Sequence, residues 1–516
     1  MSVLLALGVH GGWPDRPLSQ EAIGGPYAAL LSAATDLGPA GTLRAELTAA
    51  LRDSSQPRQL IDWADHVGLS VRWRPGDDWA VLDGPARTVA TAFGVPVHNY
   101  RSPAGEEFYA SPQQPVVPPS LHSEVSGFGR ILSYTPHHGA NPWPMPREVP
   151  DQGLSPEALL RAYSATMLQR NADGGRGVTV VVFAFDGFDQ ADLDMYARAY
   201  GLPLFTPDVV GGMPPGRRGE ATMDLEAIHA VVPQAKTVLV NALPTVDGGG
   251  TYPKIAAMMD DAQRRYPGAV WSFSIGWGCD RLLTAADLAP VRSALADAHR
   301  NGTTAFDASG DLAGLECKVG RDWAAAPSPD DVGLDAVASL PEMTSVGGTT
   351  LSTDASGDWL AERAWFDPAL SHGSGGGVSS LFDRPAWQQV NPPTSAGAGR
   401  LTPDIAAVAD QFTGMKIVFG QQFALGGGTS LAAPIWAGLT ALMDGLVTSR
   451  GGQPLGDVNP LLYRIAAHAT NPAFRDVVEG ANAVWPAGPG YDLVTGLGTP
   501  NADNLIKDLF LIQRLS

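Results

Sequence analysis

A glycine-rich stretch that ends in Thr429-Ser430 contains the side chain best placed to act as a nucleophile. An apolar run over 423–425 precedes the glycines, and a largely apolar run over 431–442 follows the serine. This pattern predicts a strand that turns sharply through glycine and opens a helix, with Ser430 at the corner. The free N–H groups of a helix start could stabilise a developing oxyanion. The alternative interpretation is an ordinary N-cap on a buried helix.

Three acidic residues could supply acid–base chemistry. Glu220 and Asp224 are four residues apart where a helix is predicted to begin, so both carboxylates lie on one face. Like charges this close favour a shared proton and raise one pKa. Asp311 follows Ser309-Gly310 in a turn at the end of a predicted strand. A solvated acidic helix start and a turn-forming Asp are the alternatives.

From about residue 154 the chain alternates buried strands with helices. The run over 178–185 is apolar and of strand length, which is typical of a central parallel strand. Further strands are predicted over 237–240, 270–275, 303–306 and 344–346, and helices over 189–200, 225–232, 252–266 and 288–301. This alternation predicts a doubly wound α/β sheet, which binds ligands at the carboxyl ends of its strands.

The part before residue 134 predicts a small α+β domain. Helices are expected over 42–52, 59–66 and 89–93, and strands over 1–9, 69–73, 79–82 and 97–100. The proline-rich segment 134–153 cannot be regular structure and predicts an extended linker open to proteolysis.

Composition limits the possible functions. The 516 residues are enough for two or three domains, and the formal charge of −19 argues against nucleic acid as a partner. No window of eighteen apolar residues is apparent, so no membrane span is expected. The run over 1–9 lacks the basic region of a signal peptide, so export would need a signal outside this sequence or an unconventional one. Secreted and cytoplasmic locations both stay open.

Together the motifs resemble the sedolisin family, the serine-carboxyl peptidases. The resemblance covers the chain from about residue 155 to its end. It rests on Glu220 with Asp224, Ser309-Gly310-Asp311, Gly427-Gly428-Thr429-Ser430 with Pro434, Gly375-Gly376-Gly377-Val378-Ser379-Ser380 with Pro385 and Trp387-Gln388, and Arg400 with Pro403-Asp404. The N-terminal part resembles the family's propeptide through Ala92-Phe93-Gly94-Val95 and Val116-Val117-Pro118.

The resemblance implies a subtilisin-like α/β fold in which glutamate replaces the usual histidine. It implies Ser430 as nucleophile, Glu220 as general base, Asp224 as the residue that orients Glu220, and protonated Asp311 as donor to the oxyanion. A carboxylate base with a raised pKa and a neutral Asp donor both favour acid conditions.

The resemblance further implies a self-inhibited endopeptidase that acts on proteins or peptides. A ferredoxin-like propeptide over 1–133 would inhibit the peptidase domain over 154–516 until the linker over 134–153 is cleaved. A monomer is expected, with neither nucleic acid nor membrane as partner. An exopeptidase, a dedicated peptide-processing hydrolase and a catalytically silent binding protein on the same fold are the alternatives.

One departure from the family concerns a further carboxylate that some sedolisins carry at the end of the first core strand. The corresponding position here is Ala184, and Asp186 follows two residues later. The hydrogen-bond network beyond Asp224 is therefore expected to be shorter or rearranged. Asp307, close before Asp311, could also shift the proton affinity of that residue.

The resemblance implies one calcium ion near the C-terminus. Asp476 and Asp492 would bind it through their side chains, and Val477, Gly488 and Gly490 through their carbonyls, which are the hard oxygen ligands that Ca²⁺ prefers. Cys279 and Cys317 lie in predicted loops at the carboxyl ends of strands. They could form a disulfide, as in some bacterial sedolisins, or be two buried free thiols.

A Ser-His-Asp triad is the competing chemistry. Of the ten histidines, His229, His299 and His372 come nearest the candidate site. None has the His-Gly-Thr context of subtilisins, and no Gly-x-Ser-x-Gly elbow surrounds Ser430. The sequence therefore favours the carboxylate base.

Overall fold

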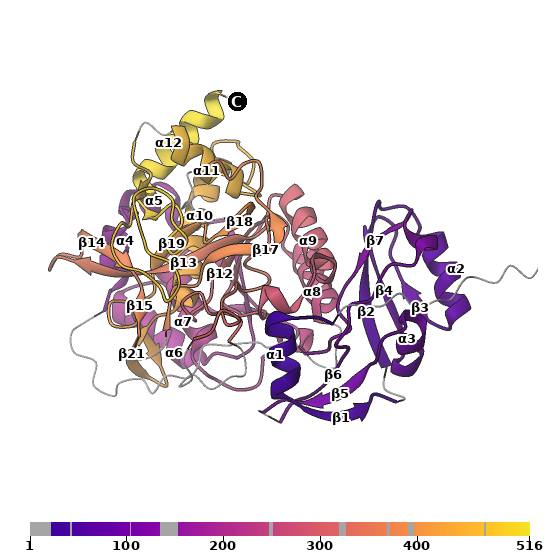
Figure 1. The fold of residues 1–516 in the computed structure, drawn as a ribbon. Coiled ribbons are helices and arrows are strands. Elements are labelled where there is room, and N and C mark those ends of the chain that lie inside the picture. The colour runs from indigo at the N-terminus through magenta and orange to yellow at the C-terminus, as the bar shows by residue number, and fades with distance from the viewer. Residues whose placement is uncertain are drawn as a thin grey trace, which may run out of the picture.

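The computed structural model describes residues 22–41, 44–103, 105–134, 153–246, 251–318, 327–368, 372–390, 397–468 and 471–515. Two bodies lie side by side, a small N-terminal one and a larger one built from the later elements (Figure 1). The predicted strand over 1–9 and nearly all of the predicted linker lie outside the described residues.

The larger body is organised around one sheet with the strand order β14-β13-β12-β11-β8-β10-β9, and β19 also pairs with β13. Every pairing is parallel except that of β13 with β14. The strands are β8 Thr179–Ala184, β9 Asp208–Val210, β10 Lys236–Asn241, β11 Val270–Phe273, β12 Thr304–Ala308, β13 Thr344–Thr353, β14 Trp359–Ala364 and β19 Ile405–Val408. The predicted parallel α/β sheet is confirmed.

Central strand β8 is buried on both faces. Val180 and Val182 belong to the core beneath α7 (Glu220–Val231) and α10 (Thr429–Ser449). Val181 and Phe183 belong to the core beneath α8 (Thr251–Arg265) and α9 (Ala285–Arg300). Because successive side chains of a strand point to opposite faces, an unbroken apolar run is what a sheet covered on both sides requires. Other elements of this body include α4 Pro156–Ala162, α5 Thr166–Asn171, α6 Gln190–Tyr200, α11 Asn459–His468, α12 Ala502–Leu515 and the hairpin of β20 Met415–Phe419 with β21 Gln422–Gly426.

Helix α10 is long and apolar enough to cross a membrane by length and composition alone. Its mean hydropathy reaches 1.4, although polar residues such as Thr440 and Asp444 interrupt the apolar run. However, 94% of the window is buried inside the protein. A helix that is apolar all round is what the core of a large domain needs.

The N-terminal body has the ferredoxin-like arrangement that was predicted. Its elements are β2 Arg44–Leu51, α2 Arg58–Val67, β3 Ser70–Arg72, β4 Trp79–Pro85, α3 Ala86–Phe93 and β7 Val125–Phe128, and its sheet has the order β3-β4-β2-β7. A second sheet of β1 Thr35–Pro39, β5 His98–Arg101 and β6 Glu107–Ala110, with α1 Gly25–Ala33, extends this body towards the larger one (Figure 1).

The helix predicted over 42–52 is wrong, because residues Arg44–Leu51 form strand β2. Ala45, Leu47, Ala49 and Leu51 are all buried, which is a period of two. Their residue types favour helix, but antiparallel pairing with β4 and β7 on either side overrides that weak preference.

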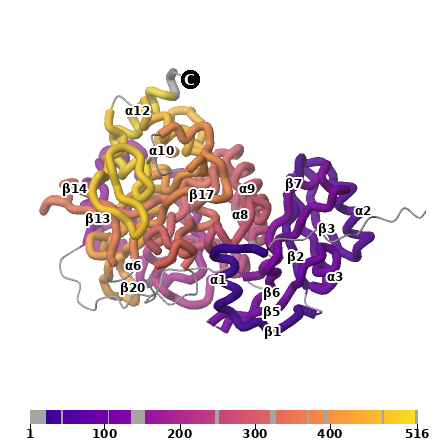
Figure 2. The backbone as a smooth tube through the Cα atoms, in the orientation of Figure 1, coloured from indigo at the N-terminus to yellow at the C-terminus, as the bar shows by residue number. Residues whose placement is uncertain are grey.

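The two bodies meet mainly along α9, against which β2, β4 and β7 pack (Figure 2). The backbone N–H of Arg130 donates to the carboxylate of Asp287 at the start of α9, at 2.8 and 3.1 Å. Arg74 forms an ion pair with Asp260 of α8 at 2.7 Å. Tyr27 of α1 is fully buried in the core of the larger body. The N-terminal body is therefore docked through both apolar and polar contacts.

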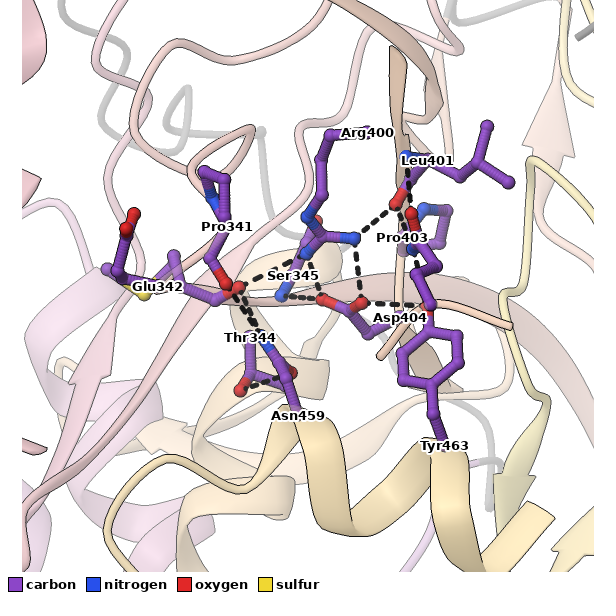
Figure 3. Close-up of polar contacts among 12 residues, drawn as sticks. Pro341, Glu342, Thr344, Ser345, Arg400, Leu401, Pro403, Asp404, Asn459 and Tyr463 are labelled. Atoms are coloured by element: carbon purple, nitrogen blue, oxygen red, sulfur yellow. Dashed lines mark hydrogen bonds and ion pairs between the residues drawn. The ribbon is translucent and has the colours of Figure 1, made fainter. Parts of the chain in front are cut away.

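The Arg400-x-x-Pro403-Asp404 motif forms a buried ionic network (Figure 3). Arg400 donates to both carboxylate oxygens of Asp404, at 2.8 and 2.6 Å, and neither side chain is exposed. The Asp404 carboxylate also accepts from the Ser345 N–H at 2.9 Å and from the Tyr463 hydroxyl at 2.8 Å. These contacts join β18 (Gly399–Thr402), the start of β13 and α11. The motif is therefore architectural and lies apart from Ser430.

Candidate active site

Ser430 lies in the first turn of α10, directly after hairpin β20–β21 and the glycines, as the sequence predicts. The residue at the corner is Gly428, which has φ of +86°. A Cβ atom there would lie 2.7 Å from Oδ2 of Asp311. Only glycine allows both this conformation and this close approach, so the corner brings Asp311 next to the nucleophile.

Glu220 is the first residue of α7, and Asp224 follows one turn later on the same face. Their exposed fractions are only 6% and 0%. Burial raises the pKa of the Glu220 carboxyl well above its usual value, and the Asp224 and Asp186 carboxylates raise it further. Burial likewise raises the pKa of Asp224. At least one proton is therefore held in this pair at acid pH.

The Ser430 hydroxyl interacts with the Glu220 carboxylate and lowers its pKa, against the effect of burial. Neither carboxylate oxygen of Glu220 has a hydrogen bond of regular geometry. Such contacts are often long in a free enzyme and tighten only when substrate binds. The Ser430 hydroxyl and the Glu220 carboxylate are thus neighbours, at a separation that substrate binding could shorten.

Ser274 links α7 and α10. Its hydroxyl lies 3.0 Å from Oδ1 of Asp224 and 3.0 Å from the carbonyl oxygen of Ser430. One hydroxyl proton can serve only one of these acceptors at a time. The sequence analysis did not single out Ser274; the available signal was a polar residue at the carboxyl end of the apolar run 270–275.

Asp311 contacts the residue before the nucleophile. Its Oδ1 accepts from the N–H and from the hydroxyl of Thr429, both at 2.8 Å. The turn that carries Asp311 is held by Gly375, whose N–H donates to the Gly310 carbonyl at 2.8 Å. The glycine-rich motif around Gly375 therefore supports the turn at the end of β12.

Asp307 is fully buried in β12. Burial raises its pKa well above the usual value, and the carboxylate that adds to this shift is Asp335. The predicted influence of Asp307 on Asp311 stays a prediction.

The nearby histidines have other partners. Nε2 of His229 lies 2.7 Å from the Pro203 carbonyl, and the ring stacks on Phe205 with centroids 3.8 Å apart. Burial lowers the pKa of His229 to about 4. His299 contacts the backbone carbonyls of Thr303 and Glu342, each at 2.7 Å. Burial lowers the pKa of His372, against the smaller opposing effects of the Asp311 and Asp367 carboxylates.

Cys279 and Cys317 form a disulfide, so the free-thiol alternative is wrong. Cys317 follows Asp311 by six residues, and the bond connects the loop after β11 to the loop after β12. These cysteines and Asp280 form a cluster with the spacing of metal ligands. Because both sulfurs are in the disulfide, the cluster does not offer a metal site.

The residues predicted to bind calcium converge on one turn. Asp492 Oδ2 accepts from the Gly488 N–H at 3.1 Å, and Asp476 Oδ2 accepts from the Gly490 N–H at 2.8 Å. Asp492 is 3% exposed, and burial raises its pKa to about 6. The turn directs N–H groups at both carboxylates, so the fit to a hard cation rests on the carboxylate oxygens of Asp476 and Asp492.

Comparisons with known proteins agree with this geometry. Residues 42–131 match the family model described as "Pro-kumamolisin, activation domain". The chain is 30% identical over 490 residues to kumamolisin of Bacillus sp. (strain MN-32), covering 89% of this chain and 84% of that protein. It is 26% identical over 460 residues to human tripeptidyl-peptidase 1, covering 81% and 76% of the two chains.

A solved structure shares the fold of the larger body. Pseudomonas sedolisin, a serine-carboxyl proteinase, superposes with a TM-score of 0.60 at 26% identity, covering 70% of this chain and 98% of that one. Sequence likeness and shared fold thus agree on both bodies: the chain belongs to the sedolisin family of serine-carboxyl peptidases and carries that family's N-terminal activation domain.

Proposed function

We propose that this serine peptidase is an acid-active endopeptidase that hydrolyses peptide bonds through an acyl-enzyme on Ser430, with Glu220 as general base. The observation that carries this proposal is the buried Glu220–Asp224 pair beside Ser430, joined to its helix by Ser274.

In the proposed reaction the Ser430 hydroxyl transfers its proton to the Glu220 carboxylate as the oxygen attacks the scissile carbonyl. Asp224 holds Glu220 in position and shares the proton. The carbonyl oxygen becomes negative and accepts a hydrogen bond from protonated Asp311, which is positioned by Thr429. Glu220 then protonates the leaving amine, and water releases the acyl group by the same steps in reverse order.

Acid dependence follows from two protonation requirements. The pair Glu220–Asp224 must give up one proton to act as a base, and Asp311 must keep its proton to act as a donor. Activity is therefore expected to fail as the pH rises towards 7.

The activation domain is proposed to inhibit the peptidase until the linker over 134–153 is cleaved. Docking of the N-terminal body on the peptidase domain, through Asp287 of α9 and Asp260 of α8, supports this. Boundaries at 133 and 154 stay predictions. We further propose a secreted monomer; the disulfide beside the oxyanion turn supports an oxidising compartment.

One calcium ion is proposed at Asp476 and Asp492, with carbonyls of Val477, Gly488 and Gly490. When bound it would supply positive charge that holds the loop together. The loop continues to Val494, whose carbonyl accepts from the Ser374 hydroxyl at 2.7 Å, next to the glycine that holds the Asp311 turn. The loop thereby supports the oxyanion side of the site.

An acid-shift experiment tests the proposal. Full-length protein is moved from pH 7.5 to about pH 4 with calcium, and chain length is followed by mass spectrometry beside Ser430→Ala. Cleavage in the linker by wild type alone, with loss of activity in the variant, is expected. An intact wild-type chain that cleaves no added peptide at any pH would refute it and favour a silent binding protein.

The exopeptidase alternative has one specific observation in its favour, the likeness to tripeptidyl-peptidase 1. Digestion of a long peptide blocked at its N-terminus distinguishes the two activities. Internal cleavage of the blocked peptide supports an endopeptidase. Release of tripeptides from the unblocked peptide alone would support the exopeptidase. Activity confined to one peptide sequence would indicate a dedicated processing hydrolase.

A further inference from the structure

Asp186 is a buried carboxylate that the proposed reaction does not use. It lies two residues beyond the end of β8 and is only 4% exposed. Its Oδ2 accepts from the N–H groups of Arg218 at 2.8 Å and Gly219 at 3.1 Å, and its Oδ1 accepts from that of Ala221 at 3.1 Å. All of these donors lie at the start of α7.

These contacts make Asp186 the cap of the helix that carries Glu220. The first N–H groups of a helix have no partner within the helix, and a polar side chain just before it usually accepts from them. Here the residue in that position is Gly219, which has no side chain and φ of +100°. A carboxylate from the loop after β8 therefore takes the role, and it accepts from the N–H groups on either side of Glu220, those of Gly219 and Ala221.

We propose that Asp186 is a positioning residue of the peptidase, which fixes the first turn of α7 against Ser430 and, through its negative charge, sets the pH range in which Glu220 works. This inference rests on the proposed role of Glu220 as general base. It also accounts for Ala184 at the end of β8, since the additional carboxylate acts on the backbone of α7 from two residues further along.

The groups that act on the Glu220 carboxyl lie on several different elements. Asp224 lies on its own helix, Asp186 on the loop after β8, Asp311 on the turn after β12, and uncharged Ser430 on α10. Burial raises the pKa of both Glu220 and Asp224, and Asp186 raises both further. Burial also raises the pKa of the Asp186 carboxyl itself, while the backbone N–H groups of Arg218, Ala221 and Gly219 favour its charged form. The nearby cation Arg217 is paired with Asp189 at 2.6 Å. No basic side chain is thus among the groups known to act on Glu220.

Two substitutions separate charge from position. Asp186→Asn keeps an oxygen acceptor for the helix start but removes the charge. Its expected effect is a shift of the acid limb of kcat/KM to lower pH by about 0.5–1 unit, because Glu220 then loses its proton more readily. Asp186→Ala removes the cap as well, and kcat should fall roughly 10–100-fold with a smaller change in KM.

Asp444→Asn is the matched control. Asp444 is also buried and accepts a backbone N–H, that of Leu455 at 2.8 Å, but it lies fourteen residues beyond Ser430 on α10. This variant should keep the wild-type pH profile. Each acid-activated protein is assayed from pH 2.5 to 6.5 on an internally quenched peptide that wild type cleaves, and its folding is checked by thermal melting.

The outcomes are distinct. A shifted acid limb in Asp186→Asn but not in Asp444→Asn supports the inference. Lower kcat or Tm in the Asp186 variants with an unchanged pH profile would overturn it and leave only a structural cap. If Asp186→Ala does not fold, the Asn variant alone decides. Failure of the proposed function would give a different result. The wild-type protein would then cleave no peptide, or Glu220→Gln would keep the activity of the wild type.

Discussion

Two buried groups of charged residues in the larger body are built on opposite principles. At Arg400–Asp404 a cation and a carboxylate face each other, and Ser345 and Tyr463 donate further hydrogen bonds to the carboxylate (Figure 3). Around Ser430, three carboxyl groups, Glu220, Asp224 and Asp186, share a buried region without a cation known to act on them.

The difference follows from what each group must do. A buried charge is tolerated when it is paired and hydrogen-bonded, and its ionisation state then stays constant over a wide pH range. A set of buried like charges must instead hold protons, and it releases them only when the pH rises. The first arrangement suits architecture, and the second suits acid–base catalysis.

The largest effect is expected for Glu220→Gln. It removes the proposed general base, so kcat should fall by about 10³-fold or more. Since it also removes one of three repelling carboxyls, thermal stability at pH 7 should stay equal or rise. Glu226→Gln is the matched control, because Glu226 lies on the same helix, is buried and accepts from Val418 N–H at 2.8 Å, away from Ser430. A strongly destabilised Glu220→Gln protein would contradict the comparison.

Breaking the compensated pair should have the opposite signature. Arg400→Met leaves Asp404 buried without its cation and should lower the free energy of unfolding at pH 7 by about 3–5 kcal/mol. Adding Asp404→Asn to this variant should recover part of the loss, measured by urea unfolding as a double-mutant cycle. If the double variant loses as much free energy of unfolding as Arg400→Met, or more, then the pairing of charges is not what stabilises this site.

Stability should also depend on pH in an unusual direction. Burial raises the pKa of Asp335 and of Asp444 to about 7, from a usual value near 3.8. Between these values the unfolded chain releases protons that the folded chain keeps, so the folded state loses stability as the pH rises from about 4 to about 7.

Each such carboxyl should contribute on the order of 2–4 kcal/mol to this loss. Tm should therefore be higher at pH 4.5 than at pH 7.5, and Asp444→Asn should make the difference smaller. A wild-type Tm that rises from pH 4.5 to pH 7.5 would mean that these carboxyls ionise normally in the folded protein.

The smallest effect is expected from calcium removal. If the ion is present at about 100 times its Kd, its loss should lower stability by about 2.7 kcal/mol. Melting with and without EDTA measures this, and Asp476→Asn should abolish the difference. An EDTA effect that survives in Asp476→Asn would place the ion elsewhere. If EDTA does not change the melting temperature of the wild type, calcium is removed from the proposal.

Where function depends on local pattern, prediction from sequence was effective. The apolar run of β8, the glycine corner before Ser430 and the spacing of Glu220 and Asp224 each concern neighbours along the chain. Strand β2 was predicted wrongly as a helix for the same reason. Its Ala and Leu residues favour helix locally, and only pairing with β4 and β7 makes it a strand.

The sequence by itself determined the residue types that can do the chemistry and the order of the elements that carry them, because these depend on short-range spacing and backbone preference. Only the tertiary structure decided which side chains meet. Ser274 reaches Asp224 across 50 residues, Asp186 caps α7 from 32 to 35 residues away, and Cys279 joins Cys317 across 38. Such contacts form where the ends of several strands lie side by side at one edge of a sheet. The distance between two residues along the chain does not predict which strand ends become neighbours.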